Sequence, residues 1–106
     1  MVKIVIVNGS PHENGATSKL ARVAARGVED AGGSVEEVRL YAYRINPCMG
    51  CVSEDVKKCY FPCPAFNDDF NDVAKKLIDS DGFILATPVY WYAPSGVLKN
   101  FIDRLT

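Results

Sequence analysis

No hydrophobic run in this sequence approaches the roughly eighteen residues that a membrane-spanning helix needs. Neither sign of charge dominates, because 12 basic and 13 acidic side chains leave a net charge of −1, too weak a field to gather nucleic acid or an anionic membrane. The first apolar run lies between Lys3 and Asn8 and is too short for the core of a signal peptide. These absences predict a soluble protein with the cytoplasm as its default compartment.

The length of 106 residues, 48% of them hydrophobic, predicts one domain spanning residues 1–106. Four cysteines fall in an irregular stretch at residues 41–66. In a reducing compartment they are expected to be thiols, metal ligands or redox groups rather than a disulfide framework.

Apolar periodicity predicts strands at residues 2–7, 34–40 and 82–87, the first and third of them buried. Helices are expected after residue 15, after a cap at residues 67–69, and after residue 96. The first helix would bury Leu20, Val23, Ala24, Val28 and Ala31, and the second would bury Phe70, Val73, Ala74, Leu77 and Ile78. This order predicts an α/β fold with a parallel sheet, whose ligand site lies beyond the carboxyl ends of the strands. Two loops qualify, at residues 8–18 and 88–95.

The first loop, "NGSPHENGATS", lacks the marks of three familiar nucleotide sites. Five residues separate Gly9 from Gly15 and Ala16 stands where a Walker loop has lysine, so nucleoside triphosphate hydrolysis is not expected. There is no G-x-G-x-x-G pattern, and Asn8-Gly9 replaces the paired acids of a response regulator. Backbone N–H groups and the side chains of Ser10, Asn14, Thr17 and Ser18 instead suit a phosphate monoester at a helix N-terminus.

A plainer interpretation of the same loop remains open: its polar residues cap the helix and its glycines make the turn. His12 is a lone histidine on this loop, and solvation is the favoured interpretation for it. The second loop carries three adjacent aromatic residues in "TPVYWYAPSG". They predict a flat wall beside a ligand, although aromatic clusters also serve in cores and interfaces.

Taken together, G-S-P-x-x-x-G-x-[ST]-S and T-P-V-Y-x-x-x-x-S-G-x-L-K-x-F-[IL]-D-R make a specific pair of motifs. With "PCMGC" between them, the chain resembles the NADPH-dependent FMN reductase superfamily of flavodoxin-like proteins, and especially its iron–sulfur flavoprotein branch. The resemblance implies an FMN phosphate held by Ser10, Asn14, Gly15, Thr17 and Ser18. It implies flavin-ring contacts from Pro88, Val89, Tyr90 and Trp91, with Ser95 and Gly96 capping the helix beside the flavin.

The activity implied is an oxidoreductase or electron-transfer flavoprotein that passes electrons from NAD(P)H through FMN to a redox partner or small-molecule acceptor. No catalytic side chain is assigned, which agrees with the lack of a convincing triad or carboxylate dyad. Two alternatives stay open. One is a non-catalytic flavin-binding carrier, and the other is a metal-binding or redox-sensing module on a truncated flavodoxin scaffold.

The implied fold is a flavodoxin-like three-layer sandwich, truncated to three strands in the order 2-1-3 instead of the full 2-1-3-4-5. The third strand would then be an apolar edge of the kind that soluble proteins avoid. A fragment, a second copy of the chain and a second polypeptide would each account for it. A homo-oligomer that covers this edge is the favoured expectation.

The cysteines are spaced as two pairs, Cys48-x-x-Cys51 and Cys59-x-x-x-Cys63, with seven residues between the pairs. The resemblance implies that these four thiolates bind a [4Fe–4S] cluster, although the spacing departs from the tighter C-x-x-C-x-x-C form. A tetrahedral zinc site and free, redox-active thiols are the alternatives.

Overall fold

A computed structural model describes residues 1–105 and places β1 (Lys3–Asn8) at the centre of a three-stranded parallel sheet. Its neighbours are β2 (Ser34–Arg39) and β3 (Gly82–Ala86), in the order β2-β1-β3. Val5 stands opposite Glu36 on one side and Phe83 on the other. The β-branched residues of β1 are wholly buried from Val5 to Val7, as expected for a central parallel strand. The predicted strand order is confirmed.

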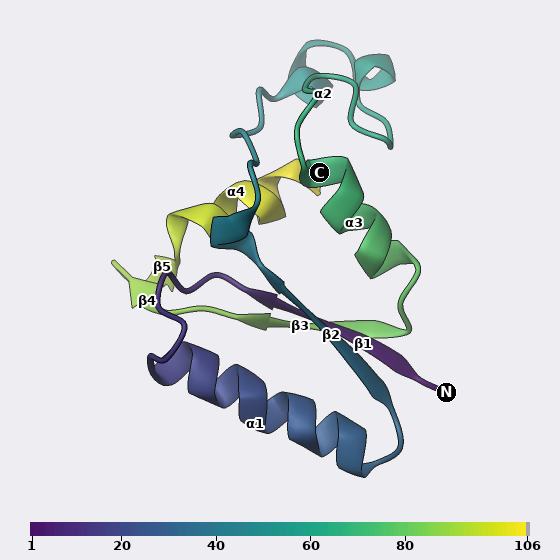
Figure 1. Ribbon diagram of the computed structural model, residues 1–106. Helices are drawn as coiled ribbons and strands as arrows, with labels where there is room; N and C mark the ends of the chain where they lie inside the picture. The colour runs from purple at the N-terminus through teal and green to yellow at the C-terminus, as the bar shows by residue number, and fades with distance from the viewer. Residues whose placement is uncertain (106) are drawn as a thin grey trace.

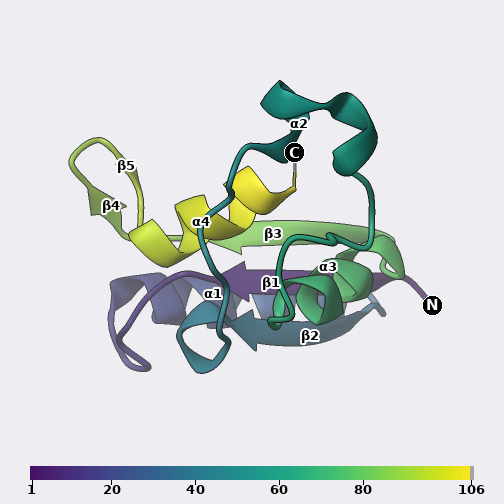
Figure 2. The ribbon, with the colours of Figure 1, turned by 90° about the horizontal axis from the view of Figure 1, so that it is seen from above.

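Helices cover both faces of this sheet (Figure 1). The helix α1 (Ala16–Asp30) lies on one face, and α3 (Phe70–Ile78) and α4 (Gly96–Arg104) lie on the other. Figure 2 shows the same arrangement from above, with α3 and α4 side by side over the strands. The predicted flavodoxin-like three-layer sandwich is confirmed. Within residues 1–105, no helix is long and apolar enough to cross a membrane.

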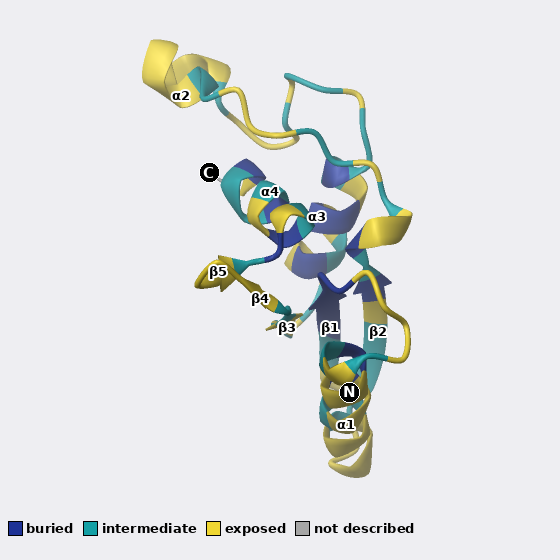
Figure 3. Cartoon of the chain, turned by 90° about the vertical axis from the view of Figure 1, so that its left-hand side faces the viewer, coloured by how far each residue is buried: buried dark blue, intermediate teal, exposed yellow. Residues whose placement is uncertain are grey.

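The main core lies between the sheet and the α3–α4 layer (Figure 3). Alternate residues of β1 point into it, because side chains along a strand alternate between the two faces. Phe70 and Phe101 bring the two helices together, with ring centroids 5.5 Å apart. The buried members are Val5, Val7, Val38, Leu40, Phe70, Val73, Ala74, Leu77, Leu98 and Phe101.

The predicted burial is wrong on α1, α3 and β3. Ile78, the last residue of α3, is 63% exposed, and Ala31 is exposed because it lies just beyond α1 as its C-cap. On α1, Leu20 and Val23 are about two-thirds exposed, at 69% and 66%, and the buried residues are Ser18 and Ala21. The helix therefore presents small side chains to the sheet, which allows a close approach, and leaves part of its apolar stripe outside. On β3, Phe83 and Leu85 are exposed because β3 has only β1 as a neighbour in the part of the chain described. Homo-oligomerisation across this edge stays a prediction.

The stretch at residues 41–66 extends away from the sheet (Figures 1 and 2). It is irregular, as predicted, apart from η1 (Leu40–Ala42) at its start and the short helices α2 (Cys51–Glu54) and η2 (Val56–Lys58). We call residues 47–67 the cysteine loop. The single-domain prediction for residues 1–106 stays a prediction.

The two ends of the cysteine loop are joined at a neck, which we define as residues 44–46 and 68–69. Arg44 N donates to Asp69 Oδ2 at 2.6 Å, and Asp69 N donates to Arg44 O at 2.9 Å. Asn46 N donates to Asp68 Oδ2 at 2.8 Å. The cap predicted at residues 67–69 is present, but the N-cap residue Asp69 does not itself accept a hydrogen bond from the first turn of α3. Asp68 does so instead, since its Oδ1 accepts from Phe70 N at 3.2 Å.

A buried ion pair holds the neck to the end of α4. Arg104 Nη1 and Nη2 donate to Asp68 Oδ2 and Oδ1 at 2.9 and 3.2 Å, and both side chains are almost fully buried. Burial raises the pKa of Asp68, but hydrogen bonds from Arg104, Asn46 N and Phe70 N outweigh it and bring the pKa down to about 2. Asp68 therefore stays ionised at any pH well above 2.

We expect Asp68→Asn to destabilise the chain by about 3 kcal/mol or more at neutral pH, because Arg104 is left as a buried charge without its partner. Because the folded-state pKa is depressed, this stabilisation is complete above about pH 4 and disappears as the pH falls through about 2. Urea unfolding of both proteins at neutral pH and near pH 2 measures the difference. Asp30→Asn, at the exposed end of α1, is the control and should change little. An equal loss at both pH values would contradict the assignment.

Candidate functional site

The loop after β1 is organised by Asn8, the last residue of that strand, which is fully buried. Its Oδ1 accepts from Ser10 N at 2.9 Å, and its Nδ2 donates to Ser18 Oγ at 3.1 Å. Ser18 Oγ in turn donates to His12 O at 2.6 Å. One amide side chain thus joins the start of the loop to the first turn of α1 and determines the shape of the loop.

The five residues predicted to hold a phosphate fall into two groups. Ser10 and Ser18 are buried, and their hydroxyls bond within the loop; Ser10 Oγ accepts from His12 N at 3.2 Å. Asn14 is exposed, and Gly15 and Thr17 are half-buried, at the mouth of the loop. The structure brings all five together at one end of α1. His12 is exposed, and its backbone N–H and C=O bond to Ser10 and Ser18.

The N-terminus of α1 is suited to an anion. Gly15 is the N-cap, no side chain of the described chain caps the helix, and its first turn has no acidic residue. About four N–H groups at such an end lack partners within the helix. They also carry the positive end of the helix dipole, so a phosphate group would be stabilised there.

The loop after β3 contains a hairpin that the sequence did not predict. The short strands β4 (Val89–Tyr90) and β5 (Ala93–Pro94) pair antiparallel. Trp91 and Tyr92 form the turn between them, with φ angles of 52° and 60°. Two consecutive left-handed residues are the hallmark of a tight hairpin turn, which favours glycine and asparagine. Aromatic residues here are strained, and such strain is commonly found at functional sites.

The hairpin extends from the carboxyl edge of the sheet (Figure 1). Trp91 and Tyr92 at its tip are 93% and 98% exposed, and Tyr90 is also exposed. The three aromatic residues are therefore exposed, with Pro88 and Val89 at the base of the hairpin, and their predicted role as a wall beside a ligand stays a prediction.

The two loops touch at Gly9 and Ser95. Ser95 Oγ donates to Gly9 O at 2.7 Å, and Gly9 N donates to Ala86 O at 2.8 Å. A Cβ on Gly9 would lie 2.7 Å from Ser95 Oγ and 3.0 Å from Leu98 Cβ, so only glycine permits this approach. Ser95 occupies the N-cap position of α4 as predicted, but its hydroxyl bonds to the first loop instead of capping the helix. Gly96 follows as the first residue of α4.

Arg39, at the carboxyl end of β2, borders the first loop and was not predicted. Its Nη1 donates to Glu13 Oε1 at 3.0 Å and its Nη2 to Ser10 O at 3.3 Å. Its Nε is buried without a partner among residues 1–105. Thr87 was also missed; its Oγ1 accepts from Ser95 N at 2.9 Å. The parallel order itself was the available signal, because residues at the carboxyl ends of neighbouring strands meet at one edge.

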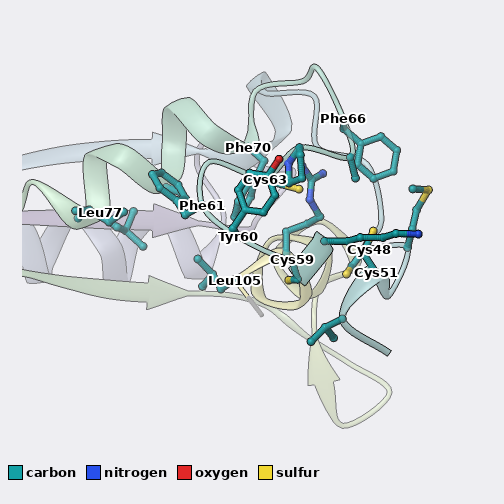
Figure 4. A pocket seen from close by; sticks show the side chains of 18 of the residues that line it. Cys48, Cys51, Cys59, Tyr60, Phe61, Cys63, Phe66, Phe70, Leu77 and Leu105 are labelled. Carbon is teal, nitrogen blue, oxygen red and sulfur yellow. The ribbon is translucent and has the colours of Figure 1, made fainter. Parts of the chain in front are cut away.

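The four cysteines line one apolar cavity of about 540 Å³ between the cysteine loop, α3, α4 and β3 (Figure 4). Cys48 Sγ accepts a hydrogen bond from Gly50 N at 3.3 Å. Cys63 is held by Asn71, whose Oδ1 accepts from Cys63 N at 2.8 Å. Among residues 1–105, however, no three Cys, His, Asp or Glu side chains are grouped closely enough to hold a metal ion. In this conformation the cysteines do not fit a cluster, and the predicted [4Fe–4S] site is not confirmed.

Known proteins are similar to this chain in sequence, and others are similar to it in fold. An iron-sulfur flavoprotein of Methanocaldococcus jannaschii is 35% identical over 103 residues, which are 97% of this chain and 51% of that protein. One from Archaeoglobus fulgidus is 34% identical over 105 residues, or 98% of this chain and 46% of that protein. The chain thus spans about half the length of these relatives.

Among solved structures, an NAD(P)H:quinone oxidoreductase from Methanothermobacter marburgensis superposes with a TM-score of 0.79. The match covers 98% of this chain and 52% of that protein, and at 18% identity it supports the fold alone. The sequence profile of one family matches residues 2–106, almost the whole chain. This chain belongs to the NADPH-dependent FMN reductase family.

Proposed function

We propose that this chain carries the FMN-binding part of a flavin oxidoreductase that takes electrons from NAD(P)H. The observation that carries the proposal is the clamp between the two loops, in which Ser95 Oγ bonds to Gly9 O at 2.7 Å. It holds an anion-binding helix end beside an aromatic surface, which together match the two parts of a flavin mononucleotide. The family membership supports the same cofactor.

The phosphate would lie at the start of α1. Asn14 and Thr17 are accessible there, while Ser10 and Ser18 keep the loop in shape through their internal bonds. Arg39 lies at the edge of the same loop, where it donates to Ser10 O and is paired with Glu13. Several modest contributions of about 0.3–1 kcal/mol each would therefore act on one dianionic group.

The isoalloxazine ring would lie against the hairpin, where Tyr90 and Trp91 offer aromatic surface and Pro88 and Val89 offer the backbone at its base. Burial of an exposed aromatic surface by a flat ring is favourable both for the area removed from water and for stacking. Bound FMN would supply the acceptance of hydride and its onward transfer as electrons. The side chains of this chain bind and orient, and none is assigned a proton-transfer role.

A carrier that binds flavin without oxidising a nicotinamide is the alternative within the same site. Steady oxidation of NAD(P)H in the presence of FMN and an added acceptor distinguishes the enzyme from the carrier.

We expect FMN to bind at least tenfold more tightly than riboflavin, a difference of about 1.4 kcal/mol or more that reports the phosphate contacts. Trp91 is the only tryptophan, so quenching of its fluorescence measures both affinities. Thr17→Ala should weaken FMN by more than about tenfold through the loss of one charge-assisted hydrogen bond, and leave riboflavin unchanged. Equal affinities for the two flavins, or no binding of either, would refute the proposed site.

We expect Gly9→Ala to weaken FMN binding more than tenfold, because the new Cβ would lie 2.7 Å from Ser95 Oγ and force the two loops apart. The fold should lose about 1–3 kcal/mol from the same crowding. Gly27→Ala in α1 is the matched control: a Cβ there meets nothing within 4 Å, and the helix should gain about 0.5–1 kcal/mol. Calorimetric titration and thermal unfolding of both variants make the comparison. Unchanged FMN affinity in Gly9→Ala would argue against the clamp.

We also propose an iron–sulfur cluster on the cysteine loop as a second candidate function. Two observations favour it: the four cysteines line one cavity, and Cys48 Sγ already accepts a backbone N–H, a kind of bond that tunes cluster sulfurs. The names of the two relatives point the same way. Since no three cysteines are grouped among residues 1–105, the loop would have to close around the cluster.

Anaerobic reconstitution with ferrous iron and sulfide should incorporate about four iron ions per chain and produce an electron paramagnetic resonance signal on reduction. Each of Cys48→Ser, Cys51→Ser, Cys59→Ser and Cys63→Ser should lower the iron content, whereas Ser53→Ala on α2 should not. Stoichiometric zinc uptake without iron would favour the tetrahedral thiolate site instead. Uptake of neither metal would leave the cysteines as redox-active thiols.

A further inference from the structure

Helix α4 is fixed at both of its ends. At its N-terminus, the buried Ser95 donates through Oγ to Gly9 O and through N to Thr87 Oγ1, at 2.7 and 2.9 Å. At its C-terminus, Arg104 is bonded to the neck of the cysteine loop. Nine residues at 1.5 Å each separate the two contacts by about 13 Å along the helix axis. The same helix therefore joins the proposed flavin site to the cysteine loop.

The helix also has little freedom to move between these ends. Leu98 and Phe101 are fully buried in the core against the sheet and α3. Protein cores are close-packed, so a shift of α4 at Ser95 is transmitted to Arg104 instead of being absorbed by slack. Ser95, α4 and Arg104 therefore form one continuous chain of contacts between the two sites, along which coupling can be tested by substitution.

Arg104 forms hydrogen bonds with the residues that precede and follow the cysteine loop. Its Nη1 donates to Asn46 O at 2.9 Å, before the loop, and its fork binds both oxygens of Asp68, after the loop. Its guanidinium stacks on Phe66 and Phe70 at 4.7 and 4.6 Å from the ring centroids. A planar, always-charged fork is needed for all of these contacts, and lysine cannot reproduce them.

We infer that Arg104 is a positioning residue that, through α4, fixes the cysteine loop relative to the proposed flavin site, so that binding at one is felt at the other. This inference rests on the proposed FMN binding. It requires neither a metal on the cysteines nor any particular electron acceptor. FMN binding would order the two loops at Ser95, and α4 would pass this order on to the neck. Because coupling is reciprocal, an ordered neck would in turn raise the affinity for FMN.

The test measures how fast an aromatic disulfide reagent modifies the cysteines of the whole chain, with and without saturating FMN. In the unsubstituted protein, FMN should slow the modification by about fivefold, at the lower end of ordinary coupling between two sites. In Arg104→Lys this ratio should fall to near one, and by the same linkage FMN affinity should weaken by no more than about fivefold. Arg26→Met, which removes an exposed arginine from α1, should keep the full ratio.

Thermal unfolding of each variant separates positioning from simple destabilisation. If Arg104→Lys lowers the melting temperature but keeps the FMN-dependent ratio, Arg104 is merely structural and the inference is wrong. If that variant fails to fold, Phe66→Leu takes its place, since loss of one stacking ring should reduce the ratio by about twofold. An unchanged ratio in that variant overturns the inference.

Direct FMN titration of the unsubstituted protein distinguishes the two levels of failure. If FMN does not bind, both the proposed function and the inference that rests on it are refuted. If FMN binds and the modification rate does not respond, only the inference is refuted.

Discussion

The hydrogen bond from Ser95 Oγ to Gly9 O is the contact on which the rest of the site depends. It joins the loops of two neighbouring strands across 86 residues of sequence, and it forms only because position 9 has no Cβ. The proposed anion-binding end of α1 and the aromatic hairpin come from separate parts of the chain. Without this contact their spacing would depend on loop conformation alone, and loops are the most mobile parts of a fold.

Much of this arrangement could be predicted from the sequence. The parallel sheet and the locations of both loops follow from periodicity and from the handedness of parallel crossovers, whereas the strand order was implied by the family resemblance. Ser10 lies in the first loop and Ser18 in the first turn of α1, and both hydroxyls bond to His12 within this segment, Ser18 also to Asn8. A motif shows which residue types are present, and it does not show whether a hydroxyl faces the ligand or the loop itself.

The residues that could not be predicted are those whose partners are distant in sequence. Arg104 and Asp68 are 36 positions apart, and Arg39 reaches Ser10 over 29. On α1, the choice of Ser18 and Ala21 over Leu20 and Val23 as the buried side depends on how closely the helix approaches the sheet. Periodicity identifies the apolar side of a helix but does not determine which residues along that side are buried against the sheet. The hairpin at Trp91 and Tyr92 contradicts ordinary turn preferences, so no local rule predicts it.

The buried pair at the neck shows why polar groups are retained in an otherwise apolar interior. An apolar pair of similar volume would often be as stable, because both charges lose their hydration on burial. It would, however, leave Asn46 N and Phe70 N without the acceptor that Asp68 provides to both. Hydrophobic packing cannot orient those two backbone segments, since it has no direction. The ion pair therefore acts mainly on geometry: it determines where an exposed loop of some twenty residues leaves the fold and returns to it. The loop is held to α3 a second time, by the paired hydrogen bonds between Cys63 and Asn71, so its return to the fold is fixed both at the neck and just before it.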